Sequence, residues 1–360
     1  MSRSEWQDLP QRLASVWTPT QEDLRFQDDE SVSMYGPWHD TRTFVARLSW
    51  AAAMSQEKRP FNDAVLAVRY LTHVMFPYPA LERITRTICR LMTLRRYSSD
   101  NSVIPMLLGP PNTGKSTTAL LAAALSDDTD FAGTHRVYAE ADHGMPATMN
   151  TPIPMIVLRG RQARNRDLMV SGLNFCTHVV VRSESAGDLQ TRLLSQATRS
   201  GTRLILLDNE HGTHTGEEKS TFFRDLIQAS PALVVITRVE DLNQGNKRRQ
   251  NAVSKDPNEE QIAERRHNLW FEPLNGDDVR DAVFANALQM CRVQLPSRKE
   301  SAQIVHAVDV ASQGFPCRIF RNLKMASTHA YLENSGKLTL DIVEEAIHKG
   351  AAPADLASVS

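Results

Sequence analysis

The stretch of this sequence that decides the fold is Gly109-Pro110-Pro111-Asn112-Thr113-Gly114-Lys115-Ser116-Thr117. It fits G-x-x-x-x-G-K-[ST], the pattern of a phosphate-binding loop. The two glycines let the backbone curl so that successive N–H groups point at a phosphate, and a following helix adds the positive end of its dipole. We therefore predict that this loop binds a nucleotide, with Lys115 reaching the β- and γ-phosphates and Ser116 ligating Mg²⁺.

The regions around the loop predict an α/β core. The apolar run Val103–Leu108 precedes the loop as a strand, and the Ala- and Leu-rich run Thr117–Leu125 follows it as a helix. Further predicted strands are Ile153–Leu158, Arg203–Leu207 and Ala232–Thr237. Further predicted helices are Asp167–Phe175, Ala186–Arg199 and Lys219–Ala229. This alternation predicts a mostly parallel sheet with helices on both faces.

Helices are predicted on either side of this core. Ahead of it, the helical periodicity covers Asp63–Met75 and Ala80–Arg95. After Asn275, the predicted helices are Asp277–Cys291, Arg298–Ala311, Arg318–Asn334 and Leu340–Lys349. We therefore expect a helical N-terminal appendage (1–75), an α/β nucleotide-binding domain with the P-loop (76–272), a small all-helical lid (273–350) and a flexible tail (351–360).

Bulk composition narrows the functional classes. The 360 residues carry 41 Lys and Arg against 42 Asp and Glu, so any nucleic-acid surface must be local. The 4 cysteines lack C-x-x-C spacing, which argues against a zinc site or a disulfide framework and suits a reducing cytosol. The N-terminus lacks the apolar stretch of a signal peptide, and no segment has the length of a membrane span. We expect a cytoplasmic protein with no membrane partner.

A second acidic site follows the loop, as nucleotide hydrolysis requires. The apolar run Leu204–Leu207 ends in Asp208, which we predict to hold the metal from the end of a neighbouring strand. The next residue is Asn209, whose amide cannot take a proton from water, and Glu210 follows it. Either Glu210 supplies the base or hydrolysis is slow. Thr237 ends another strand, where its hydroxyl can read the γ-phosphate.

Arginines supply further candidate contacts. Arg265 and Arg266 could reach across a subunit boundary as a finger for the neighbour's ATP. Arg318, after Gly314-Phe315-Pro316-Cys317, could fold over the nucleotide from the helical lobe. The candidate DNA-backbone contacts are Arg159, Arg161, Arg164 and Arg166. A second basic run, Asn246–Gln250, could do the same, and a solvated face is the alternative for both. His211 and His214 are interpreted as part of a polar loop rather than as metal ligands.

The order of these motifs resembles one family. The segments that carry the resemblance are Pro79–Arg95, Met106–Ser116, Pro152–Val157 and Arg203–His211. They are similar to the TniB/TnsC/MuB group of AAA+ ATPases that regulate DNA transposition, over about Phe76 to Gly350. The resemblance implies an ATP- and Mg²⁺-dependent homo-oligomer, a ring or filament, on double-stranded DNA. It also implies that the oligomer marks target sites and recruits a transposase and an accessory targeting protein.

The family's site residues fall on the candidates already named. Lys115 and Ser116 match the Walker A pair, and Asp208 matches the Walker B aspartate. Asn209 falls where the family has its water-activating Glu, so the resemblance does not imply rapid turnover. Thr237 and Arg318 match the first and second sensors. Arg265 or Arg266 falls in the finger region, and the loop from Arg159 to Arg166 falls where the family contacts DNA.

Two other functions are compatible with the same core. One is a signalling or defence ATPase, in which the N-terminal appendage with its four tryptophans (Trp6, Trp17, Trp38 and Trp50) binds an effector and no DNA is contacted. The other is a loader or initiator ATPase of replication. The sequence after the helical lobe shows no additional DNA-reading domain, which counts against an initiator.

Overall fold

The computed structural model describes residues 51, 54–55, 59–97, 103–111, 113–125, 155–159, 165–177, 185–199, 201–210, 226–230, 232–239 and 266–350. These fall into two compact units. The core unit holds the described residues from Arg83 to Phe271. The helical unit combines those of Ala46–Glu82 with those from Glu272 onward.

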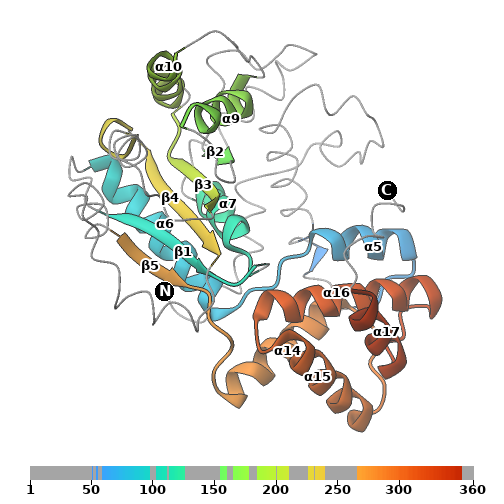
Figure 1. The fold of residues 1–360 in the computed structure, drawn as a ribbon. Coiled ribbons are helices and arrows are strands. Elements are labelled where there is room, and N and C mark those ends of the chain that lie inside the picture. The colour runs from blue at the N-terminus through green and yellow to red at the C-terminus, as the bar shows by residue number, and fades with distance from the viewer. Residues whose placement is uncertain are drawn as a thin grey trace. The chain divides into compact units, whose positions relative to one another are not determined.

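The core unit is built on a five-stranded sheet in which every strand pair is parallel. Its strands are β1 (Ile104–Gly109), β2 (Met155–Arg159), β3 (Leu204–Glu210), β4 (Leu233–Val239) and β5 (Arg266–Trp270). Their order across the sheet is β2-β3-β4-β1-β5 (Figure 1). The apolar runs of β1 to β4 are buried, as expected of a sheet covered on both faces. All strands end at one edge, which is where open α/β sheets bind ligands.

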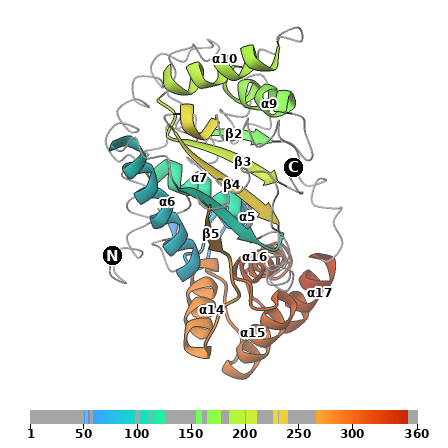
Figure 2. The ribbon, with the colours of Figure 1, turned by 60° about the vertical axis from the view of Figure 1, so that its left-hand side comes forward.

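The named helices beside this sheet, within the described residues, are α6 (Pro79–Tyr97), α7 (Lys115–Leu125), α9 (Asn165–Thr177) and α10 (Ala186–Arg199). Helix α7 packs against β1, β3 and β4, and the Cys89 thiol of α6 donates to the Ala122 carbonyl of α7 at 3.5 Å. Helix α9 packs on β2 and α10 packs on α9 (Figure 2). A Cβ on Gly172 would lie 2.3 Å from Leu158 Cδ2, so the close approach of α9 to β2 requires glycine there.

The helical unit joins residues from both ends of the described chain. It contains α5 (Ala64–His73), α14 (Asp277–Cys291), α15 (Arg298–Ser312), α16 (Pro316–Glu333) and α17 (Leu340–Gly350). Helix α16 contacts all four of the others. The Asp63 side chain caps α5 by accepting from Val65 N at 2.8 Å. After α5, Phe76 packs on Phe320 of α16 with ring centroids 4.8 Å apart.

These elements confirm the predicted fold class, an α/β core with a parallel sheet followed by a helical lobe. Helices α10 and α14 have the bounds that the sequence predicts. Strand β5 was not predicted, because Arg266, His267 and Asn268 are exposed and leave only a short apolar end. Of the predicted helix 219–229, only 226–229 lies within the described residues, and it is helical.

The compact units differ from the linear segments expected from sequence, since α5 belongs with the C-terminal helices. The limits at residues 75, 272 and 350 stay predictions. The tail 351–360 and nearly all of the appendage lie outside the described residues. Within the part of the chain that the structure describes, no helix combines the length and the apolar character needed to cross a membrane.

Candidate nucleotide site

The phosphate-binding loop lies between β1 and α7, as the motif requires. Gly109 and Gly114 have φ angles of 150° and 84°, in the region that favours glycine. A Cβ on Gly109 would lie 3.1 Å from Cβ of Phe271, whose N–H donates to the Leu108 carbonyl at 2.8 Å. Phe271 therefore supports the loop from the end of β5. The apolar run Leu269-Trp270-Phe271 was the only sequence signal for this support.

The loop is closed by its own threonines. Thr113 Oγ1 donates to the Pro110 carbonyl at 2.9 Å. The N–H and the hydroxyl of Thr118 donate to the Gly114 carbonyl at 2.9 Å and 2.8 Å. These bonds fix the start of α7, whose first turn carries Ser116 and Thr117. Gly109 and Pro110 are buried and Pro111 is exposed, while Asn112 lies outside the described residues.

The Lys115 ammonium is held by the backbone of this loop. It donates to the Gly109 carbonyl at 3.0 Å and to the Pro110 carbonyl at 2.7 Å, and only 6% of the residue is exposed. A cation held among carbonyls at a helix N-terminus is the arrangement that receives a phosphate. The loop therefore fits a triphosphate on the geometry of its own residues.

Three of the predicted residues meet at one carboxylate oxygen. Ser116 Oγ donates to Asp208 Oδ1 at 2.5 Å, and Thr237 Oγ1 donates to the same oxygen at 3.0 Å. Thr237 is fully buried. A carboxylate and a hydroxyl in contact beside a phosphate site are the donors that Mg²⁺ prefers. The structure thus brings Ser116, Asp208 and Thr237 together from α7, β3 and β4, and the donor set fits the metal.

Asn209 and Glu210 are the last two residues of β3. The strand is in regular register with β2 through Asp208, which pairs with Arg159. Against β4 the register shifts: Leu207 pairs with Ile236, but Glu210 pairs with Arg238. This irregularity next to the predicted catalytic residues has no signal in the sequence.

The predicted finger residue Arg266 is the first residue of β5 and pairs with Ile104, at the sheet edge opposite the P-loop. It therefore does not reach the P-loop of its own subunit. Arg265 lies outside the described residues. Arg318 belongs to the helical unit, where its guanidinium donates to Gln313 Oε1 at 2.8 Å.

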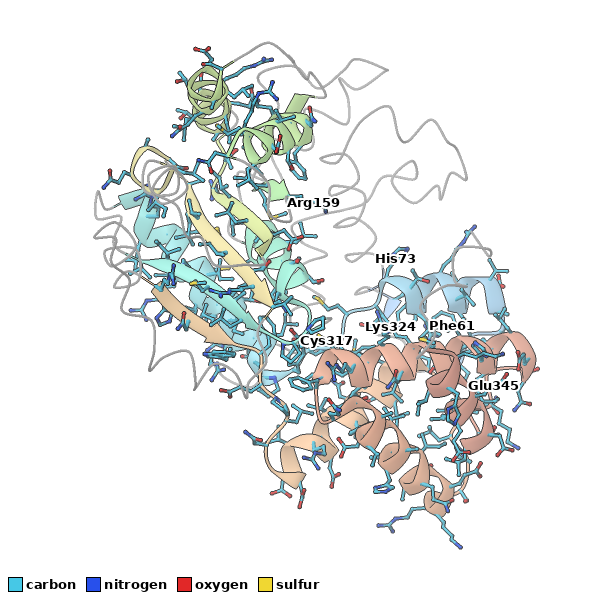
Figure 3. The ribbon with its side chains drawn as sticks, viewed as in Figure 1. Phe61, His73, Arg159, Cys317, Lys324 and Glu345 are labelled. Carbon is cyan, nitrogen blue, oxygen red and sulfur yellow. The ribbon has the colours of Figure 1, made fainter. Side chains whose placement is uncertain are left out.

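The predicted DNA loop is described only at its two ends. Arg159 is exposed at the end of β2, and its N–H donates to Ser171 Oγ of α9 at 2.9 Å (Figure 3). Arg166 is half-buried in the first turn of α9. Arg161, Arg164, the run Asn246–Gln250 and the pair His211 and His214 lie outside the described residues.

Comparisons with known proteins give similarity in structure only. No family model matches this sequence, and no curated protein matches it. Aeropyrum pernix ORC2, solved in ADPNP and ADP complexes, is 15% identical, with 78% of this chain and 70% of that chain covered and a TM-score of 0.49. Drosophila ORC bound to DNA is 16% identical over 81% of this chain and 66% of that chain, with a TM-score of 0.43.

A third similar structure is the Thermotoga maritima RuvB Holliday junction branch migration motor. It is 13% identical over 74% of this chain and 68% of that chain, with a TM-score of 0.41. Similarity this low does not show what the chain binds. The functional argument therefore depends on the site itself: a phosphate-binding loop whose serine meets the aspartate of β3 and the threonine of β4.

Proposed function

We propose that this protein is an AAA+ type ATPase that oligomerises on double-stranded DNA and regulates DNA transposition. The observation that carries the nucleotide part is the meeting of the Ser116 and Thr237 hydroxyls at Asp208 Oδ1, beside the buried Lys115. Such a set binds and orients a triphosphate, because it combines a cation, a metal-binding carboxylate and a polar side chain at the γ-phosphate end.

Each of these residues has a separate task in the proposed site. Lys115 exchanges its carbonyl partners for phosphate oxygens and neutralises their charge. Ser116 and Asp208 hold Mg²⁺, which when bound supplies further neutralisation of the phosphate charge. The Thr237 hydroxyl is hydrogen-bonded to Asp208, so a movement of Asp208 when the metal binds or leaves also moves or frees this hydroxyl.

The position of Arg266 supports the proposed oligomerisation. Because it begins β5 at the edge opposite its own P-loop, a role in catalysis requires the P-loop of another subunit. ATP bound at that boundary then stabilises the oligomer. Each subunit contributes Arg159 and Arg166 as DNA-backbone contacts. Because one assembly makes many such contacts at once, its affinity for DNA is much higher than that of a single subunit. The role in transposition, with recruitment of a transposase and an accessory targeting protein, is supported by the resemblance to the TniB/TnsC/MuB group.

The test is duplex-DNA binding followed by fluorescence anisotropy with ATP and Mg²⁺, with ADP and without nucleotide. We expect DNA binding only with ATP. Lys115→Ala protein should bind DNA at least about 100-fold more weakly, because the loss of the lysine removes both the charge that neutralises the phosphates and the contact that orders the loop around ATP. Lys115→Ala protein that coats duplex DNA as well as wild type would contradict the proposal.

The DNA contacts need a control for simple loss of charge. Arg159→Ala and Arg166→Ala should each weaken binding and reduce its dependence on salt concentration, by about one unit of slope per contact. Arg298→Ala is the matched control for Arg159→Ala, because Arg298 is also exposed but begins α15 in the helical unit. ATP-dependent oligomers with no salt-sensitive DNA binding would instead favour the signalling or defence switch.

A further inference from the structure

A histidine and two glutamates come together on one side of the helical unit. His329 and Glu333 belong to α16, and Glu345 belongs to α17. The His329 Nδ1 atom and one carboxylate oxygen of each glutamate all lie within 4.8 Å of one another. These three residues belong to the helical unit, whereas the nucleotide-binding loop belongs to the core unit. Their chemistry is therefore separate from that of the proposed ATPase site.

The two helices determine where these side chains lie. Residues four apart are neighbours on a helix surface, and His329 Nδ1 lies 3.9 Å from Glu333 Oε1. Helices α16 and α17 pack on each other, and Glu345 of α17 is labelled in Figure 3. Ala330 and Ala346, the residues that follow His329 and Glu345, are fully buried. The backbone beneath the cluster is thus held in the core of the helical unit.

The ring nitrogen that faces the two carboxylates lacks a hydrogen bond. His329 Nδ1 is buried and has no hydrogen-bond partner, although 22% of the side chain is exposed. The exposed part of the ring therefore lies away from Nδ1. A buried polar atom without a partner costs free energy, and 3.9 Å to Glu333 is too long for a hydrogen bond. A metal ion between the nitrogen and the carboxylates removes this cost, because imidazole nitrogen is a common metal ligand.

The two glutamates already attract a cation. The Lys349 ammonium lies 2.5 Å from Glu345 Oε1. A hydrogen bond to Glu345 and its charge, with a further contribution from the charge of Glu333, raise the pKa of Lys349. The Lys349 side chain is 58% exposed, so its ammonium can move into water without leaving a buried charge behind. A metal ion at the cluster therefore has to displace only an exposed ammonium.

We infer that His329, Glu333 and Glu345 bind a divalent transition-metal ion, with zinc as the best fit, and that this ion links α16 to α17. One imidazole nitrogen and two carboxylate oxygens suit four-coordinate zinc with water as the fourth ligand. Magnesium fits poorly, because it prefers six oxygen ligands and loses its water reluctantly. The inference gives the helical unit a function of its own and does not depend on the proposed ATPase activity.

The experiment is titration of the metal-free full chain with Zn²⁺, followed by calorimetry. Because other groups of the chain can also bind zinc, the site is defined by the difference between wild type and variants. His329→Ala and Glu333→Gln should each weaken zinc binding at least about 10-fold. His306→Ala is the matched control, since it removes an exposed histidine from α15 and should leave zinc binding unchanged. Zinc should also slow hydrogen exchange in α16 and α17 of wild type, but not of His329→Ala protein.

A lysine variant tests the displacement of the ammonium. Lys349→Met should bind zinc about fivefold more tightly or better, because one positive charge next to the ion is removed. Lys337→Met is the control for net charge, since Lys337 is an exposed lysine between α16 and α17. It should change zinc affinity much less than Lys349→Met.

Three outcomes overturn the inference. Equal zinc affinity of wild-type, His329→Ala and Glu333→Gln protein would show that the ion binds elsewhere. Zinc-dependent protection from exchange outside α16 and α17 alone would show the same. An equal gain in affinity from Lys349→Met and Lys337→Met would mean that general charge, and not this cluster, attracts the ion.

Discussion

The core unit and the helical unit are each stabilised internally by a different kind of contact. In the core, parallel strands bring Ser116, Asp208 and Thr237 together at one sheet edge, and the site is a consequence of strand order. In the helical unit, cohesion comes from side chains that connect residues far apart in the sequence. Local sequence motifs therefore identify the site residues of the core unit, whereas the contacts that stabilise the helical unit are visible only in its three-dimensional packing.

The clearest example in the helical unit is a cluster around Tyr331. Its hydroxyl accepts from Phe61 N at 3.3 Å, across 270 residues of sequence, and donates to the Arg292 carbonyl. The Arg292 guanidinium lies 3.8 Å from the Phe61 ring centroid and donates to the Arg59 carbonyl. Tyr70 of α5 donates to the Met290 carbonyl at 2.8 Å. These bonds fasten the segment around α5 to α14 and α16.

The largest expected effect lies in the core alone. Asp208→Asn keeps the size of the side chain but removes the charge that holds the metal, and should lower kcat for ATP about 100-fold or more. Hydrogen exchange in α16 and α17 should stay as in wild type. A loss of protection in those helices would show that the two units are not independent in stability.

Two glycines give a matched pair of stability tests, one in each unit. Gly172→Ala places a Cβ 2.3 Å from Leu158 Cδ2, and Gly336→Ala places one 2.7 Å from the Tyr331 ring at a φ of +82°. Each should cost about 1–3 kcal/mol of unfolding free energy through overpacking. Hydrogen-exchange mass spectrometry should locate the first loss in α9 and β2 and the second in α16. Loss of protection in both units from either change would contradict the separation.

A pH-dependent effect on stability is expected in the helical unit. Burial lowers the pKa of Lys324 on α16 to about 8, and its ammonium lies 5.5 Å from the Phe76 ring centroid (Figure 3). In the unfolded chain this lysine keeps a pKa near 10.5. Between these values the unfolded state binds more protons, so the lysine makes folding more favourable as pH rises.

Lys324→Met should therefore stabilise the protein at pH 7, by about 1–2 kcal/mol. The advantage over wild type should shrink as pH rises through 8 toward 10.5. Thermal unfolding of both proteins over this range measures the difference directly. An advantage that is constant with pH would mean that packing, rather than the charge of Lys324, determines it.

The smallest expected effect tests the cluster itself. Tyr331→Phe removes one hydroxyl that makes two hydrogen bonds and should cost about 1–2 kcal/mol. Exchange should increase in α5 and around Arg292, with the ATPase rate unchanged. Thr328→Val is the control, since it also removes a hydroxyl from α16 and Thr328 is only half-buried. Equal losses from both changes would argue against a special role for the Tyr331 hydroxyl.

Sequence reasoning located the loop, Asp208 and Thr237 because each ends an apolar run of the length of a buried strand. It could not locate β5, whose first three residues are exposed. It could not place α5 on α16 either, because the contacts of Phe61 and Tyr70 are with residues more than 200 positions away. The register shift between β3 and β4 was also hidden, since register is a property of two strands and not of one.

The hydrogen bond from Arg159 N to Ser171 Oγ bears on the proposed binding of DNA. It joins the end of β2 to α9, so both ends of the segment between Arg159 and Arg166 are held by regular structure. In the proposed DNA complex, Arg159 and Arg166 are thus presented from positions that a strand and a helix already fix. Ser171→Ala should then weaken DNA affinity without touching any DNA contact.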